Sequence, residues 1–271
     1  MLSRDPRNAT IRFIEKIGRS TVAGIEEMGS GGVMFFESIY WLIAGPRMKQ
    51  PVRIGSIFVQ MMEIGIRAIP IIGIMAATIG VMLAIQGIHT LKIFGAESRV
   101  VIGIAFSIVR EFAPLITGIL VAGRSGSALA ARIGTMKINQ EIDALQVMGI
   151  NPIRFLVAPA LLAMIVMVPA LTIFSNFAGL LAGGVYVGAS LDISLAAYID
   201  ETINILRVED VMHGLTKSVL FAILIAIIGV VNGASVSGGA EGVGRVTTRS
   251  VVQAISAIVI TDMLFAFIDT R

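Results

Sequence analysis

The sequence predicts an all-α protein that crosses a membrane several times. Of its 271 residues, 56% are hydrophobic and only 14% are charged, too few polar groups to cover the surface of a soluble domain. Uncharged runs long enough to cross about 30 Å of hydrocarbon recur, such as residues 68–88. The small net charge of +3 gives no reason to expect a nucleic-acid partner, and the absence of cysteine excludes disulfides and thiol chemistry.

We expect two units, an N-terminal surface region and a five-span region. Residues 1–54 are rich in Lys and Arg, and their apolar runs are short, so we interpret them as one or two interfacial amphipathic helices. Within them, the aromatic segment 31–45 suits the headgroup boundary, and Glu37 disfavours a full span. The second unit, residues 55–271, holds predicted spans at about 68–88, 100–122, 155–190, 218–234 and 251–268.

The third predicted span is the longest uncharged run, but it is too short for two spans and a turn. We therefore expect one tilted or kinked helix, with Pro159 and Pro169 as candidate kink sites. Its glycines permit close approach of neighbouring backbones; they are Gly179, Gly183, Gly184 and Gly188.

The distribution of basic residues predicts the topology. Lys and Arg number eight in residues 1–53, four in 123–154 and two in 235–250, against four in the segments expected on the other side. Because basic loops stay in the cytoplasm, we expect a cytoplasmic N-terminus and a C-terminus on the outer face.

A polar segment, residues 123–154, separates two long apolar runs and is expected to lie in the cytoplasm. We predict a short helix at 139–148, capped by Asn139, with Glu141 and Asp143 near the positive end of its dipole. Gly149 supplies a left-handed stop. A helix this short is marginal alone, so its apolar stripe, Ile142, Leu145 and Met148, needs a packing partner, either another protein or the bilayer surface.

Charged residues also fall within or beside the predicted spans. Arg110 and Glu111 lie near the middle of the second span, Lys217 precedes the fourth, and Asp262 lies in the fifth. A charge in hydrocarbon costs at least about 2.5 kcal/mol, so these side chains must face protein or a wet cavity. Adjacent helical residues point apart, so Arg110 and Glu111 need partners elsewhere. For Arg110 and Glu111, both a structural ion pair and a substrate-facing role remain open.

Three stretches together are similar to one known family. They are residues 107–159 (SIVREFAPLITGILVAGRSGSALAARIGTMKINQEIDALQVMGINPIRFLVAP), 213–221 (HGLTKSVLF) and 232–252 (NGASVSGGAEGVGRVTTRSVV). They resemble the MlaE family of permeases, the membrane subunits of ABC transporters that move lipids between membranes. The likeness covers roughly residues 55–270. Two departures are Phe112-Ala113, where the family usually has Leu-Gly, and Arg132, where it usually has Glu.

The resemblance implies a homodimer in the bacterial inner membrane, with a periplasmic C-terminus and a periplasmic MCE-domain protein above it. It implies a separate cytoplasmic ATPase that holds ATP and magnesium, with no cofactor on this chain; whether a small regulatory subunit also binds the ATPase is left open. The helix at 139–148 would be the coupling helix, with Glu141, Asp143, Leu145 and Met148 at the ATPase. Arg110 and Glu111 would lie near a lipid cavity at the dimer axis.

Two other classes of function stay open on the residues alone. An ion- or proton-coupled carrier would use Glu111 and Asp262 as relay carboxylates. An intramembrane enzyme would have Asp262 and His213 as acid and base, but no nucleophile motif supports it. The chain has neither a GxxxxGK[ST] phosphate-binding motif nor metal-ligand spacing around its two histidines, so we expect no metal site and no catalytic residue.

Overall fold

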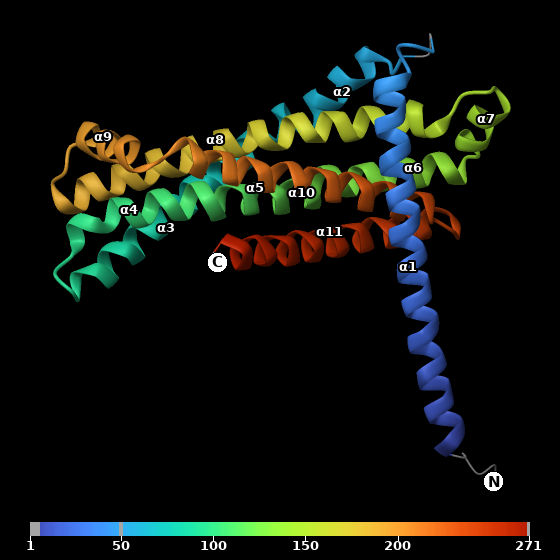
Figure 1. Ribbon diagram of the computed structural model, residues 1–271, viewed down its shortest axis with the longest axis horizontal. Helices are drawn as coiled ribbons and strands as arrows, with labels where there is room; N and C mark the ends of the chain where they lie inside the picture. The colour runs from blue at the N-terminus through green and yellow to red at the C-terminus, as the bar shows by residue number, and fades with distance from the viewer. Residues whose placement is uncertain (1–5, 49–50, 270–271) are drawn as a thin grey trace.

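The computed structural model describes residues 6–48 and 51–269, which are helical and include no strand. Of these residues, five segments are long and apolar enough to cross a membrane, as predicted. The segments are Ile54–Lys92, Glu97–Ile138, Ile153–Leu191, Val208–Ala234 and Gly239–Ile268. They run side by side along the long axis of the molecule (Figure 1).

Each span is assembled from one or more helical elements. The first contains α2 (Ile54–Ile64), η1 (Ile66–Ala68) and α3 (Ile69–Lys92). The second contains η2 (Glu97–Arg99), α4 (Val100–Phe106), η3 (Ser107–Phe112), α5 (Ala113–Val121), η4 (Ala122–Gly126) and α6 (Ser127–Ile138). The third contains η5 (Ile153–Val157) and α8 (Ala158–Leu191), the fourth is α10 (Val208–Ala234), and the fifth is α11 (Gly239–Asp269).

The helices extend beyond the predicted spans. Charged residues such as Glu63 and Arg124 interrupt the uncharged runs but not the backbone hydrogen bonds, and Glu and Arg favour helix. The helical segment of the first span therefore begins at Ile54 rather than near residue 68. Residues 123–138, predicted as part of the polar segment, instead continue the second span through η4 and α6.

The predicted short helix exists as α7 (Glu141–Val147), but its cap is different. Gln140, at φ 58°, precedes α7 without a side-chain cap, whereas Asn139 ends α6 and its amide donates to Glu141. Gly149 has the predicted positive φ, at 72°.

The expectation that the apolar stripe of α7 has no partner within the chain was wrong for two of its three residues. Leu145 is only 8% exposed and Ile142 is half-buried; both pack into the chain's own main apolar core. Met148 is 64% exposed, so it alone of the stripe remains available to another molecule.

The N-terminal region forms one helix, α1 (Pro6–Ala44), that runs across the bundle near its α7 end (Figure 1). The Glu37 carboxylate accepts from the Asn151 amide at 2.8 Å and from the Trp41 indole at 3.3 Å. The Arg154 guanidinium lies 5.2 Å from the centre of the Trp41 ring. These contacts attach α1 to the segment that follows α7.

Helices α3 and α8 pack backbone against backbone, as the glycine pattern predicted. A Cβ at Gly80 would lie 2.1 Å from the carbonyl oxygen of Gly179, and one at Gly183 would lie 3.1 Å from that of Gly80. Gly184 is similarly covered by the Tyr198 ring of α9 (Leu195–Ile205), the short helix at the other end of the bundle. The α8 helix is one continuous helix of 34 residues with Pro169 inside it.

Gly80→Ala is expected to separate α3 from α8, because a methyl group there overlaps backbone atoms that cannot rotate away. Overpacking of this kind costs about 1–3 kcal/mol, measurable as a lower midpoint of thermal unfolding in detergent. Gly103→Ala is the matched control, since nothing lies within 4 Å of the position of its Cβ. Equal midpoints for the two variants would contradict the packing assignment.

Candidate functional site

Five charged side chains from three spans meet inside the bundle. The Lys217 ammonium lies 2.6 Å from the Glu111 carboxylate and 3.0 Å from that of Asp262. Beside this group, the Arg110 guanidinium lies 3.4 Å from the Asp210 carboxylate. We call these five side chains the ion network. It joins η3, α10 and α11, and it answers the question of where Arg110 and Glu111 find partners.

The ion network is closed on one side and open on the other. The Lys217 side chain has no exposed surface, and that of Asp262 is 15% exposed. The side chains of Arg110 and Glu111 are 27% and 39% exposed. A ligand could therefore reach Arg110 and Glu111 without disturbing the buried ammonium behind them.

The local backbone explains how two adjacent residues face two different partners on α10. Arg110 and Glu111 lie in η3, a π-helical segment followed by Pro114, which has no N–H to donate to the Arg110 carbonyl. On α10, Gly214 approaches so closely that a Cβ there would lie 2.4 Å from the Val109 carbonyl oxygen. The close approach brings α10 within reach of both side chains.

Sequence interpretation missed one member of the ion network, and it named the neighbouring His213 only as the base of an alternative enzyme. The missed member, Asp210, lies in the first turn of α10, where its carboxylate also accepts from the Arg207 N–H. The His213 ring packs edge-on against Phe265 with centroids 5.9 Å apart. The sequence feature that could have predicted this grouping is the helical spacing of Asp210, His213 and Lys217, which places all three on one face of a helix.

The residues predicted to act in coupling lie elsewhere, on α7 at the opposite end of the bundle from α9 (Figure 1). Glu141, Asp143 and Met148 are exposed, whereas Leu145 is buried in the chain. Val147, which the sequence interpretation did not single out, is 89% exposed, more than the neighbouring Met148. The molecule thus has an ion network within the bundle and an acidic, partly apolar surface at one end.

Lys217→Met is expected to destabilise the protein by about 3–5 kcal/mol, because it leaves the Glu111 and Asp262 carboxylates without the cation they share. Thermal unfolding in detergent measures the effect, with the exposed Lys92→Met as control. Adding Glu111→Gln and Asp262→Asn should restore most of the stability, since neutral side chains need no counter-charge. If Lys217→Met alone were as stable as the control, the network would have no structural role.

Comparison with known proteins agrees with this architecture. The sequence model of the family described as Permease MlaE matches residues 57–268. A probable ABC transporter permease protein of Rickettsia felis is 32% identical over 94% of this chain and 96% of its own length. A protein of Haemophilus influenzae named as an intermembrane phospholipid transport system permease, MlaE, is 30% identical over 95% of this chain and 97% of its own. A probable ABC transporter permease protein of Synechocystis is 37% identical over 77% of this chain and 80% of its own. Together with the five spans, these matches show that the chain belongs to the MlaE permease family.

Proposed function

We propose that this chain is the transmembrane permease subunit of an ATP-driven ABC transporter that moves phospholipid or a related lipid between the inner and outer membranes of a bacterium. The observation that carries the proposal is the ion network, which places accessible charges of both signs, Arg110 and Glu111, beside the apolar core of the bundle. A lipid needs this combination, because its acyl chains avoid water while its headgroup requires counter-charges. The name of the Haemophilus influenzae relative supports the choice of phospholipid.

The energy for transport would come from a separate chain. This sequence has no phosphate-binding motif of the GxxxxGK[ST] type, so ATP and magnesium would bind to a cytoplasmic ATPase subunit. Helix α7 would be the contact, because it presents the exposed carboxylates of Glu141 and Asp143 beside the exposed apolar side chains of Val147 and Met148. Leu145 would contribute indirectly, by anchoring α7 to the bundle.

The contacts of α7 offer a route from the ATPase to the spans. Only the turn around Gly149 and Asn151 separates α7 from η5 and α8. The Asn151 side chain accepts from the N–H groups of Ile153 and Arg154 and donates to Glu37 of α1. A rotation of α7 would therefore move the start of α8 and the surface helix α1 together, which is the kind of rigid-body motion that changes the tilt of spans.

A homodimer fits the distribution of apolar surface. In the apolar window of α11, only 11% of residues are buried within the chain, compared with 61% in the third span. The exposed face of α11 needs either lipid or a second copy of the chain to cover it. We place the dimer in the bacterial inner membrane with a cytoplasmic N-terminus, a periplasmic C-terminus and a periplasmic MCE-domain protein at the α9 end.

An ion- or proton-coupled carrier finds less support. Its two relay carboxylates would be Glu111 and Asp262, and both are held by the single ammonium of Lys217. A relay would have to break these ion pairs in every cycle. Transport by the permease alone in vesicles that carry an ion gradient, without any ATPase, would favour the carrier over our proposal.

Arg110→Ala and Glu111→Ala are each expected to reduce ATP-dependent lipid transfer between reconstituted vesicles by about tenfold or more, because each removes a charged hydrogen-bonding group. Lipid transfer is measured with a fluorescent phospholipid, and co-purification of the ATPase serves as the assembly control. The exposed Arg245→Ala is the matched substitution on the surface. Wild-type transfer in both network variants would remove Arg110 and Glu111 from the mechanism.

Asp143→Lys and Val147→Asp are expected to release the ATPase, since one reverses a charge on the exposed side of α7 and the other places a charge in its apolar patch. Co-purification of the ATPase with tagged permease measures this. Thermal unfolding should remain unchanged, because neither side chain is buried. Leu145→Asp, by contrast, should destabilise the permease itself. Full retention of the ATPase by both surface variants would exclude α7 as its docking site.

A further inference from the structure

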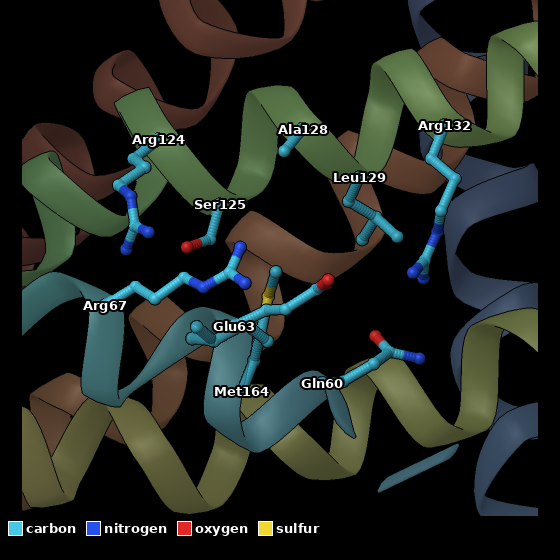
Figure 2. A pocket seen from close by; sticks show the side chains of 10 residues that line it. Gln60, Glu63, Arg67, Arg124, Ser125, Ala128, Leu129, Arg132 and Met164 are labelled. Atoms are coloured by element: carbon cyan, nitrogen blue, oxygen red, sulfur yellow. The ribbon is translucent and has the colours of Figure 1, made fainter. Parts of the chain in front are cut away.

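A cavity of about 270 Å³ between the first two spans is lined by three arginine side chains (Figure 2). Arg67 comes from η1, Arg124 from η4 and Arg132 from α6. Figure 2 shows all three side chains directed into the space between α2 and the helix that contains η4 and α6. We call this space the arginine cavity. It shares no residue with the ion network.

The arginine cavity has an excess of positive charge. Glu63 is the one carboxylate among its lining residues, against three guanidinium groups. Within residues 6–48 and 51–269, none of these three guanidinium groups has a nitrogen atom within 4.0 Å of a carboxylate oxygen. Two buried polar side chains also line the space, Gln60 at 8% exposed and Ser125 at 9%. The cavity can therefore offer an anion several hydrogen-bond donors at once.

Two of the three arginines lie where uncharged runs end on the α7 side. Arg67 directly precedes the uncharged run 68–88, and Arg124 directly follows the uncharged run 112–123. Arg132 lies two turns farther towards α7, about 12 Å along the helix. The phosphates of a bilayer leaflet lie just outside its hydrocarbon, so we expect Arg67 and Arg124, at the ends of these runs, to lie near that level. Ile64, Leu129 and Met164 give the same cavity an apolar wall.

We propose that the arginine cavity binds a phosphate group, from a phospholipid headgroup or from free phosphate. Guanidinium groups match phosphate oxygens in a planar, bidentate geometry. Figure 2 shows the Arg67 and Arg124 head groups on one side of the Glu63 carboxylate and the Arg132 head group on the other, so the cavity offers guanidinium donors on both sides of that one carboxylate. The apolar wall favours a phosphate that carries acyl chains over the inorganic ion. The cavity is a binding site additional to the ion network, and it does not depend on the proposed transport.

Titration of the purified full-length protein in a maltoside detergent, without phosphate buffer, tests the proposal. The probes are dihexanoyl phosphatidylcholine, inorganic phosphate and dihexanoylglycerol, which lacks the phosphate. The phospholipid should bind and dihexanoylglycerol should not. Arg67→Gln and Arg132→Gln should each weaken binding by about tenfold to a hundredfold, the loss of a charge-assisted hydrogen bond. Glu63→Gln should strengthen it severalfold, because it removes the one opposing charge.

Two further variants separate binding from folding. Arg67→Lys keeps the positive charge but loses the planar guanidinium group that can donate two parallel hydrogen bonds. This variant should therefore bind the phospholipid with intermediate affinity and unfold at the wild-type temperature. The exposed Arg99→Gln, near the α9 end, makes the same charge change and should leave binding unchanged. Inorganic phosphate binding as tightly as the phospholipid would support the site and assign it to free phosphate. Wild-type binding in both glutamine variants, or equal binding of dihexanoylglycerol, would overturn the proposal. No step uses ATP or measures transport, so the result is independent of the proposed function.

Discussion

The buried ammonium of Lys217 is the interaction on which the interior of the bundle depends. It has no exposed surface, and two carboxylates from two other spans surround it at 2.6 and 3.0 Å. Ions removed from water are stable only when their partners are well placed, so this contact fixes α10 against η3 and α11. The close approach at Gly214 and the π-helical turn of η3 supply the required geometry. The same contact leaves Arg110 and Glu111 at the open side of the network, where a ligand can meet them.

Polar groups in this molecule are concentrated at separate levels along the spans. The ion network lies nearer the α9 end, since Lys217 is in the third turn of α10, which begins directly after α9. The arginine cavity lies where the uncharged runs end on the α7 side, and the surface of α7 lies beyond it. Between these levels the described spans carry no Asp, Glu, Lys or Arg side chain. A lipid moving along the bundle would therefore meet charges at defined depths rather than continuously.

Helix α1 and the segment that follows the short helix α7 are connected through a few polar contacts. Glu37 is held by Asn151 and Trp41, and Arg154 stacks over the same indole ring. The Glu37 carboxylate, which in the sequence only disfavoured a membrane span, thus links α1 to the Asn151 segment, which is distant in the chain. On α7, the apolar stripe is divided between the chain's own core, which takes Leu145, and the surface, which keeps Met148.

The sequence by itself determined the number of spans, the single long helix around Pro169 and the glycine-mediated packing, because these follow from apolar length and side-chain size along one segment. It also indicated that Arg110 and Glu111 need partners, since charges in hydrocarbon cannot remain alone. Which partners they find was decided only by the tertiary structure, because Asp210 lies 100 residues from Arg110 in the chain and Lys217 lies 106 residues from Glu111. The arginine cavity and the burial of Leu145 were equally hidden, because each arises from helices that are neighbours in space but separated in the chain.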